Sequence, residues 1–545
     1  MSRKEEKVDP MQNEKTENRI GPAGTQEKTP GIFLLFFAIS AFVLLFVASR
    51  SSYLYPYNTW CDVNSYFTVG KSLFNGLMPY RDVFDQKGMY LYFFYGLAYL
   101  VSHTTLIGGF WLEVIAGFFD IWGSYRILRL FTSKKTALIL SPVSFAVTVS
   151  AYCFLYGGSA EELMLPFLIW GLYLVLEYAQ RTDRERAVLM PVKTLILGGV
   201  LAGMIANLKF NSLGFFFFWM AWVFFSFLRE KKWLEGFKAC GWFLLGMALP
   251  FVPWFFYFLI RGGLYYWYWG TIDINVFSYS NLGDEGIGIG QRIYELAKQF
   301  YWLIRQNTVA FVLIIMGTAW AMLRKGQRLW NRLLVPGLLG FLFLGIYVGG
   351  SSIAYYAVPL MIFTVMGVAA AGCLIERYLK GSLTVENAEQ ADPCEEKVQT
   401  DFCRRRFYYG IPVVSLLLCL LLVWMTSMNV PYRNTEKEDI YLYRFAPIVA
   451  QTKDPTLLNV GCLDAGLYTV CDILPTCQWF QTQTVNSDTP YETQYRWIEE
   501  QKVDYVICRN EYVPDNLWEK YELVSQADWE EMGYTYTYYL FRVKR

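Results

Sequence analysis

The sequence predicts a polytopic α-helical membrane protein that carries a small α/β domain after its last membrane span. Of its 545 residues, 54% are hydrophobic and 19% are aromatic. Many apolar runs are long enough to cross a hydrocarbon layer about 30 Å thick, whereas residues 430–545 change to a mixed helix-like and strand-like pattern. A soluble enzyme is thereby excluded. A net charge of +1 and one histidine also argue against a nucleic-acid partner, which needs a basic surface.

The N-terminal part divides into a polar tail and the start of the membrane domain. Residues 1–30 mix basic with acidic side chains, contain Pro and Gly and lack apolar periodicity, so we expect a disordered cytoplasmic tail. The apolar run 31–49 has no basic segment directly before it and no small-residue cleavage site, which favours a retained helix over a signal peptide. The membrane domain is expected over residues 31–429.

Ten further apolar runs predict spans within this domain. They lie at roughly residues 105–130, 136–154, 162–180, 194–208, 212–228, 239–260, 304–323, 333–349, 357–376 and 409–429.

The basic connections predict the orientation of the spans. The sequences SKK, QRTDRER, REKK and RKGQR and the polar stretch 377–408 hold most Lys and Arg of the domain, so the positive-inside rule places them in the cytoplasm. This holds only if the run 88–103, with about fifteen apolar residues, does not cross the bilayer. We therefore expect a short re-entrant or juxtamembrane helix there and about eleven crossings. The chain is then a multi-pass cell-membrane protein with its N-terminus inside and residues 50–104 and 430–545 outside.

The expected outer domain, residues 430–545, shows no catalytic signature of its own. KEDIYLYRFAPIVAQ suits an amphipathic helix, and TLLNVGC, KVDYVICR and YTYTYYLFRVK suit strands bounded by turn residues. It has no glycine-rich phosphate loop and no nucleophile elbow. Its four cysteines could form one or two disulfides if the domain lies outside the cell. They are Cys462, Cys471, Cys477 and Cys508.

The segments expected on the outer side carry an unusual set of polar side chains. The loop 50–87 is the richest, because PYRDVFDQKG packs four charges into ten residues of a chain in which 17% of positions are charged. The full set is Asp62, Lys71, Arg81, Asp82, Asp85 and Lys87 in this region, Glu161 and Glu162 in YGGSAEE, Lys209 and Asn211 in NLKFNS, and Tyr355 and Tyr356 in SSIAYYAVP.

Each of these residues has an ordinary structural explanation when it is taken alone. A charge in an outer loop, such as Lys71 or Asp82, is usually solvated. Paired acids at a helix start favour the helix dipole, a lysine at a helix break can snorkel to the headgroups, and tyrosines can belong to an interfacial aromatic belt.

The combination indicates a transfer reaction. Carboxylates and cations together lie where a lipid-linked phosphate headgroup would sit and where a hydroxyl acceptor could approach from water. Transfer of a sugar from a phospholipid carrier needs a carboxylate to take the proton of the acceptor. It also needs cations to bind the phosphate and to stabilise the charge that develops on it.

The same residues carry a family resemblance. The pattern DxNxYxxxGKxLxxGxxPYRDVFDxKG resembles the GT-C membrane glycosyltransferases, in particular the bacterial branch related to protein O-mannosyltransferases and to the aminoarabinose transferases that modify lipid A. YGGSAEE, LKFN and IAYYAVP follow in the order of that branch. The resemblance covers roughly residues 30–430 in layout. It makes five residues candidates for lining the substrate cavity: Glu161, Glu162, Asn211, Tyr355 and Tyr356.

The resemblance also implies roles for the charged residues of the loop. Asp62 would be the catalytic base or the carboxylate that positions the acceptor, and Asp85 would assist it. Lys87 would hold the donor phosphate, with Arg81 or Lys209 helping. Members of the family use a polyprenyl-phosphate sugar as donor and invert the anomeric centre. No cofactor is implied, and no metal site is expected, because the loop lacks a DxD-type metal motif.

The sequence therefore predicts an inverting glycosyltransferase with three classes of partner: the bilayer, a polyprenyl-phosphate sugar, and a hydroxyl on a cell-envelope glycan, glycolipid or protein. A transporter or flippase of a lipid-linked sugar is one alternative, for which the intramembrane carboxylates Glu113 and Asp120 are the only hint of charge at depth. A non-catalytic envelope-binding protein is another. Release of polyprenyl phosphate from a sugar donor separates the enzyme from both alternatives.

Overall fold

The computed structural model describes residues 28–185, 189–278, 289–349, 353–386 and 410–545, apart from residues 484, 486, 511 and 532. The tail expected at residues 1–30 lies, except for its last three residues, outside the described residues. The same holds for most of the polar connection 377–408.

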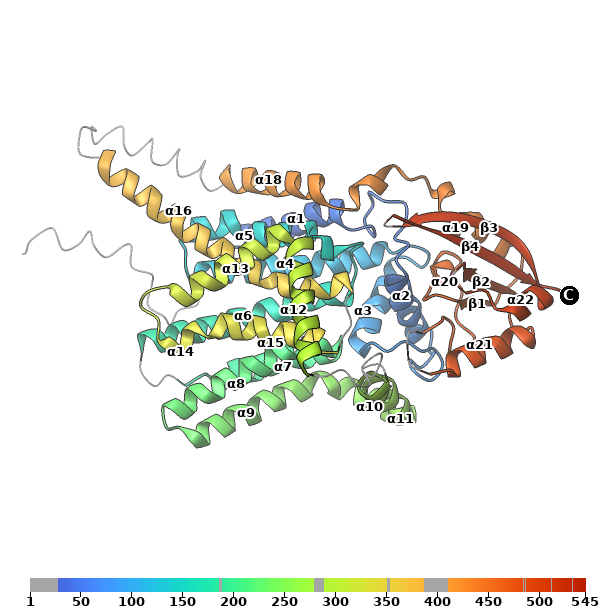
Figure 1. Ribbon diagram of the computed structural model, residues 1–545, viewed down its shortest axis with the longest axis horizontal. Coiled ribbons are helices and arrows are strands. Elements are labelled where there is room, and N and C mark those ends of the chain that lie inside the picture. The colour runs from blue at the N-terminus through green and yellow to red at the C-terminus, as the bar shows by residue number, and fades with distance from the viewer. Residues whose placement is uncertain are drawn as a thin grey trace, which may run out of the picture.

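A bundle of helices makes up most of the molecule, and most of these helices run along its long axis (Figure 1). The bundle helices are α1 (Gly31–Ala48), α4 (Ile107–Arg129), α5 (Lys134–Ser150), α6 (Ala160–Arg184), α7 (Val192–Ala206), α8 (Leu213–Arg229), α9 (Trp233–Ala248), α10 (Val252–Ile260), α11 (Leu264–Tyr268), α12 (Ile289–Gln306), α13 (Thr308–Leu323), α14 (Leu329–Arg332), α15 (Leu334–Tyr347), α16 (Thr364–Glu386) and α18 (Ile411–Thr426).

Close backbone approach joins neighbouring helices of the bundle. A Cβ atom on Gly199 of α7 would lie 2.0 Å from the carbonyl oxygen of Phe243 in α9, and one on Gly246 would lie 2.2 Å from that of Ile196. The pair α13 and α16 meets in the same way, at Gly317. Small residues at such contacts are typical of membrane helices, which cannot rely on the hydrophobic effect to associate within lipid.

The helices agree only partly with the expected spans. Six described helical segments are long and apolar enough to cross a membrane, or seven if the bent pair α12–α13 is counted as one span. The run 304–323 was expected as a single helix. It is broken next to Asn307, where the chain bends by 113° between α12 and α13. The number of about eleven crossings stays a prediction, because several bundle helices, such as α7 with 15 residues, are short.

The run 88–103 forms a short helix. It is α3 (Met89–Val101), with 13 residues. At a rise of 1.5 Å per residue it is about 20 Å long, which is less than the hydrocarbon thickness of about 30 Å. Its length therefore fits a helix that does not cross the membrane, whereas its position relative to the bilayer stays a prediction.

Residues 441–543 form a separate α/β unit at one end of the bundle, here called the C-terminal domain (Figure 1). Its sheet has the order β1-β2-β4-β3, with β1 and β2 parallel and the other pairs antiparallel. The strands are β1 (Leu457–Val460), β2 (Tyr505–Arg509), β3 (Tyr521–Glu531) and β4 (Tyr534–Val543), and the helices are α19 (Tyr441–Val449), α20 (Leu467–Val470), α21 (Thr489–Glu499) and α22 (Asp515–Lys520).

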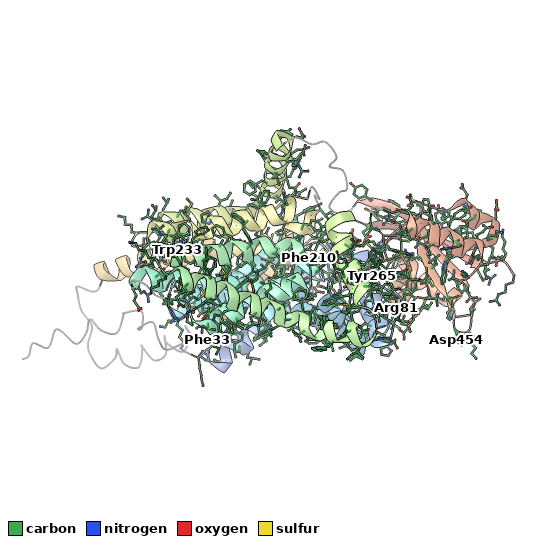
Figure 2. All side chains as sticks on the ribbon, turned by 90° about the horizontal axis from the view of Figure 1, so that it is seen from below. Phe33, Arg81, Phe210, Trp233, Tyr265 and Asp454 are labelled. Carbon is green, nitrogen blue, oxygen red and sulfur yellow. The ribbon has the colours of Figure 1, made fainter. Side chains whose placement is uncertain are left out.

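The basic connections gather at the opposite end of the bundle. There the backbone N–H of Ser133 donates to the Glu376 carboxylate (2.8 Å), and that of Arg328 donates to Asp183 (2.8 Å). Figure 2 shows Trp233, next to the basic α8–α9 turn, far from the C-terminal domain. The two ends of the bundle therefore differ in chemistry, as the positive-inside rule leads us to expect.

Lys71 differs from its expected state as a solvated charge. It lies in α2 (Cys61–Phe74), and its side chain is fully buried against the C-terminal domain. Its ammonium donates to the carbonyl oxygen of Tyr468 (2.7 Å) and lies 3.6 Å from the Asp472 carboxylate. Burial lowers the pKa of Lys71 to about 8, although Asp472 opposes this shift. Lys71 therefore fastens α2 to the C-terminal domain.

The disulfides that the sequence leaves possible are not formed among Cys471, Cys477 and Cys508 of the C-terminal domain. Cys471, Cys477 and Cys508 are reduced thiols, and the side chains of Cys477 and Cys508 are buried. Burial raises the pKa of Cys477 to about 11 and that of Cys471 to about 12, so these thiols stay protonated near neutral pH.

Candidate active site

Asp62 lies in the first turn of α2, where the helix dipole favours a carboxylate. Its side chain is 8% exposed. The phenol of Tyr355, from the 3-10 helix η6 (Ala354–Phe363), donates to Oδ2 of Asp62 at 2.7 Å. Tyr66, one turn further along α2, donates to the same oxygen at 3.3 Å. Because both phenols use Oδ2, they leave the second carboxylate oxygen, Oδ1, for another partner.

Asp85 and Lys87 share one tyrosine. The Tyr92 phenol of α3 donates to Oδ2 of Asp85 at 3.0 Å and accepts the backbone N–H of Lys87 at 2.8 Å. Asp85 is buried, and this burial raises its pKa, although Lys87 and Tyr92 oppose the shift. A second nearby carboxylate, that of Asp62, raises the pKa of Asp85 further. The two acids of the loop therefore belong to one electrostatic site.

Gly88 fixes the position of Lys87. A Cβ atom on Gly88 would lie 2.0 Å from the carbonyl oxygen of Asn207, so no larger residue fits there. The backbone N–H of Gly88 donates to the carbonyl oxygen of Leu208 (3.1 Å). The end of the loop is thereby joined to the break between α7 and α8, which carries Lys209.

The ammonium of Lys87 is available for a ligand. Within the described part of the chain, no hydrogen bond or ion pair engages it. Burial alone would lower the pKa of Lys87, but the carboxylates of Asp85 and Asp62 and the phenol of Tyr356 more than offset this, so the pKa lies above its ordinary value. Lys87 is therefore a cation that faces two buried carboxylates without being neutralised by direct contact.

Lys209 is neutralised by a neighbouring acid. It forms an ion pair with Glu161, which is fully buried at the start of α6. Its ammonium also lies 3.6 Å from the centre of the Tyr356 ring. The positive charge of Lys209 lowers the pKa of Lys87, by less than the Asp85 carboxylate raises it. The two cations therefore belong to the same site.

Gly157 and Gly158 directly precede α6 and are held in place by contacts at the start of that helix. Ser159 caps the helix by accepting the backbone N–H of Glu162 (2.9 Å), and the carboxylate of Glu162 accepts that of Gly158 (2.8 Å). Gly157 and Gly158 have φ of 82° and 84°, a conformation that favours glycine. One oxygen each of Glu161 and Glu162 is buried without a hydrogen-bond partner.

Arg81 is not brought into this cluster. Its guanidinium forms a bidentate contact with the neighbouring Asp82, at 2.7 Å and 2.8 Å. Arg81 is labelled in Figure 2, beside the C-terminal domain. Asn211 lies near Lys209 in the chain, and its side-chain nitrogen is buried without a hydrogen-bond partner.

The C-terminal domain also contacts the loop 50–87. Gln478 donates to the carbonyl oxygen of Tyr80 and Gln483 donates to that of Phe84, both at 2.8 Å. Gln481 donates to the Ser65 hydroxyl at 2.7 Å. These contacts fix the backbone on either side of Arg81 and the outer face of α2.

A buried acid from the hairpin β3–β4 also reaches the start of α2. Glu531 accepts the Thr59 hydroxyl at 2.8 Å and lies 3.7 Å from the Arg50 guanidinium. Burial raises the pKa of Glu531, although Arg50 and Thr59 oppose this shift. Glu531 thereby links the C-terminal domain to the residues directly before Asp62.

Of the three tyrosines that hold the two acids, sequence reasoning named Tyr355 as a site residue but missed Tyr66 and Tyr92. Tyr66 stands four residues after Asp62, and this spacing alone places both on one helix face. Tyr92 could not be recognised as a partner of Asp85, because the turn at Gly88 decides where α3 begins. Glu113, one of the two carboxylates expected within the membrane, accepts the Ser49 hydroxyl at 2.9 Å. Among the described residues, no three His, Cys, Asp or Glu side chains converge as a metal site requires.

No family model and no curated protein matches the sequence. The structure is similar to ArnT from Cupriavidus metallidurans bound to undecaprenyl phosphate, with a TM-score of 0.57 and 13% identity over 94% of this chain and 98% of that chain. The apo form of that ArnT matches over the same shares, with a TM-score of 0.56 and 12% identity.

A more distant structure is also similar. The apo oligosaccharyltransferase from Archaeoglobus fulgidus has a TM-score of 0.51 and 11% identity, and the match covers 87% of this chain and 69% of that chain. Both neighbours are members of the GT-C superfamily. The resemblance seen in the loop motifs is thus confirmed at the level of the fold, and the chain has the fold of the GT-C membrane glycosyltransferases.

Proposed function

We propose that this protein is an inverting glycosyltransferase that moves a sugar from a polyprenyl phosphate to a hydroxyl of a cell-envelope glycan, glycolipid or protein. The observation that carries the proposal is the unpaired Lys87 ammonium, which shares its site with the buried carboxylates of Asp62 and Asp85. A cation held charged but not neutralised by contact suits an incoming phosphate. The fold similarity to a protein crystallised with undecaprenyl phosphate supports this class of donor.

In the proposed reaction Asp62 is the general base. Its Oδ2 is occupied by two phenols, so Oδ1 takes the proton of the acceptor hydroxyl. The acceptor oxygen then attacks the anomeric carbon from the face opposite the phosphate, and the bond from that carbon to the phosphate oxygen breaks. The electron pair leaves with polyprenyl phosphate, and the configuration at the anomeric carbon is inverted.

Lys87 stabilises the leaving group in this step. The phosphate gains negative charge as its bond to the sugar breaks, and the fixed ammonium opposes that charge. Asp85 keeps Lys87 protonated, because its carboxylate raises the pKa of the lysine. Lys209 shares its charge with Glu161 and therefore has a smaller part in phosphate binding. Arg81, bound to Asp82, has no direct part.

The side chains around Lys209 provide a wall for the sugar. The rings of Tyr355 and Tyr356 meet edge to face, with centroids 5.0 Å apart, and Glu161, the ion-pair partner of Lys209, has one buried oxygen without a hydrogen-bond partner. Such an oxygen can accept a hydrogen bond from a sugar hydroxyl, which would satisfy it. The C-terminal domain, docked on α2 and the loop, would form the side from which the acceptor approaches.

The test is a transfer assay with the purified full-length protein and a panel of polyprenyl-phosphate sugars. Products and released polyprenyl phosphate are identified by mass spectrometry. Asp62→Asn should lower turnover by about 10²–10⁴-fold, because it removes the general base. Donor binding should remain. Asp82→Asn, which removes a carboxylate from the same loop outside the cluster, is the matched control and should retain turnover.

Equal turnover of the wild-type protein and Asp62→Asn would refute the assignment of the base. Absence of released polyprenyl phosphate with every donor would instead favour transport or simple binding, since neither breaks the bond between sugar and phosphate.

A further inference from the structure

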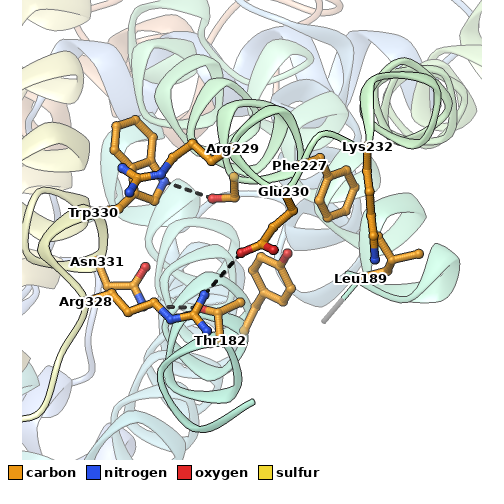
Figure 3. Close-up of a pocket in the computed structure, with 11 residues that line it drawn as sticks. Thr182, Leu189, Phe227, Arg229, Glu230, Lys232, Arg328, Trp330 and Asn331 are labelled. Carbon is orange, nitrogen blue, oxygen red and sulfur yellow. Dashed lines mark hydrogen bonds and ion pairs between the residues drawn. The ribbon is translucent and has the colours of Figure 1, made fainter. Parts of the chain in front are cut away.

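A second polar cavity lies at the end of the bundle opposite the candidate active site (Figure 3). It is formed by the last turns of α6 and α8, the connection after α8, and the start of α14. Its walls are Tyr178, Thr182, Leu189, Ser226, Phe227, Arg229, Glu230, Lys232, Arg328, Trp330 and Asn331. Glu161 at the start of α6 belongs to the candidate active site and Thr182 near its end lines the cavity, so the two sites are about 30 Å apart along this helix, at ~1.5 Å per residue.

The cavity suits a compact group. Its volume is about 140 Å³, which is smaller than the ~300–1,000 Å³ of sites that enclose a whole small molecule. A phosphate group could enter, while the remainder of a larger ligand would stay outside.

The lining of the cavity is cationic. Arg229, Lys232 and Arg328 surround it, and Glu230 is the only acid among the lining residues, all of which the structure describes. Glu230 lies 3.5 Å from Arg328 and offsets part of that charge. The C-terminal dipoles of α6 and α8 offset a further part. The lining nevertheless keeps more positive than negative side chains.

Several contacts hold these cations in place before any ligand binds. The backbone N–H of Arg328 donates to Asp183 (2.8 Å), and its guanidinium donates to the carbonyl oxygen of Glu185 (3.0 Å). The Asp183 carboxylate also accepts the Asn331 amide (2.7 Å). The Arg229 guanidinium lies 5.3 Å from the centre of the Trp330 ring. Figure 3 shows Arg229 beside the Trp330 ring and Arg328 beside Glu230.

The Trp330 ring is itself fixed. Its indole N–H donates to the Ser226 hydroxyl at 2.9 Å, and that hydroxyl donates to the carbonyl oxygen of Trp222 at 2.8 Å. The wall that supports Arg229 therefore does not need to be ordered when a ligand binds, which lowers the entropic cost of binding.

We propose that this cavity binds a phosphate group, supplied either by the headgroup of an anionic phospholipid or by free phosphate. Arginine binds phosphate through two parallel N–H donors, and basic pockets between membrane helices on the Lys/Arg-rich side are suited to anionic headgroups. The inference is independent of the proposed glycosyl transfer, because it concerns residues at the other end of the bundle.

The test measures binding of defined probes to the full-length protein. Native mass spectrometry counts phosphatidylglycerol or phosphatidylcholine molecules bound to the detergent-solubilised protein, and isothermal calorimetry measures inorganic phosphate. One expected result is that phosphatidylglycerol binds more tightly than phosphatidylcholine. The other is that inorganic phosphate binds in the absence of lipid. The first result identifies a lipid headgroup as the source, and the second identifies free phosphate. If neither probe binds selectively, the proposal is overturned.

Two variants change the affinity in opposite directions. Arg229→Gln combined with Lys232→Gln should weaken binding roughly twentyfold, at about fivefold for each cation removed. Glu230→Gln removes the one lining acid and should tighten binding by about fivefold. A gain of affinity cannot come from misfolding, so this variant remains informative if the double variant is unstable.

Lys238→Ala is the matched control. Lys238 is an exposed lysine of α9 that pairs with Glu235, outside the cavity but in the first turns after the same basic connection. Its loss should leave the affinity unchanged. If Lys238→Ala weakens binding as much as the double variant does, or if Glu230→Gln has no effect, the anion is held by general surface charge and the cavity is not the site.

Discussion

The two ends of the helix bundle both concentrate charge, but they arrange it differently. At the end beside the C-terminal domain, Lys209 is paired with Glu161, and Lys87 remains unpaired between buried carboxylates. At the opposite end, three cations and one acid line a single cavity, and one of the cations, Arg328, lies 3.5 Å from that acid, Glu230. A cation without an ion-pair partner, such as Lys87, can stabilise negative charge that develops during a reaction. A cavity lined by more basic than acidic side chains suits the binding of an anion.

This difference also appears in how each end is held together. The loop with Asp85 is fixed from outside by glutamine side chains of the C-terminal domain, such as Gln483. The opposite cavity is fixed by contacts within the bundle itself, such as that of Arg328 with Asp183. The first end therefore depends on the C-terminal domain, whereas the second does not.

The largest effect that separates the two ends is expected from Gly88→Ala. The new Cβ would overlap the carbonyl oxygen of Asn207, so the end of the loop must shift and carry Lys87 with it. A displacement of about 1 Å can cost roughly 100-fold in turnover. Phosphate binding at the opposite cavity should be unchanged. Gly340→Ala is the control, because the space around this glycine is open. Equal turnover of the wild-type protein and Gly88→Ala would show that the loop tolerates the shift.

A smaller effect should distinguish the unpaired cation from the paired one. Lys87→Met should raise the donor KM by about 10- to 100-fold, because a charged hydrogen bond contributes about 1.5–3 kcal/mol, and should leave the melting temperature nearly unchanged. Lys209→Met should instead lower the melting temperature, since it leaves the buried Glu161 without its counter-charge. If both variants destabilise the protein equally, Lys87 is a structural cation.

The pH dependence of donor binding should depend on Asp85. Lys87 is charged below its pKa, so donor binding is present below that pKa and is lost as the pH rises through it. The Asp85 carboxylate is the largest of the effects that raise the pKa of Lys87, whereas burial lowers this pKa. Asp85→Asn should therefore move the alkaline loss of donor binding to lower pH. KM measured from neutral to alkaline pH tests this, and Asp82→Asn, for which the alkaline loss should not move, is the comparison.

The smallest effect is expected from the phenols on Asp62. Tyr355→Phe removes the 2.7 Å hydrogen bond and should lower kcat by about fivefold, which corresponds to about 1 kcal/mol. Tyr66→Phe, which removes the 3.3 Å contact, should lower it less. Melting curves control for folding. A larger loss for Tyr66→Phe would reverse the assignment of the main partner.

The helices and the loop motifs could be predicted because their signals are local. Apolar runs mark the bundle helices, and the alternation in TLLNVGC, KVDYVICR and YTYTYYLFRVK coincides with β1, β2 and β4. Strand β3 was not predicted, because its alternation is broken by the acids of YELVSQADWEE. The break beside Asn307 was missed, although the polar residues RQNT at 305–308 interrupt the apolar run at that point.

The partners of the site residues could not be predicted because they are distant in sequence. Lys71 meets Tyr468 and Asp472, and Thr59 meets Glu531, across separations of several hundred residues. A lysine in an outer loop has the same local pattern whether it is solvated or buried. Only the docking of the C-terminal domain decides between these states.

The glutamine contacts of the C-terminal domain have a consequence for biosynthesis. A ribosome delivers the loop that contains Tyr80 and Phe84 long before it delivers Gln478 and Gln483, because domains emerge from the N-terminal side first. Until the last part of the chain has been translated and folded, those backbone carbonyls lack their partners and the loop lacks its final shape. A nascent or prematurely terminated chain would insert its helices without completing the candidate active site, and under the proposed function it would leave the lipid-linked sugar untouched.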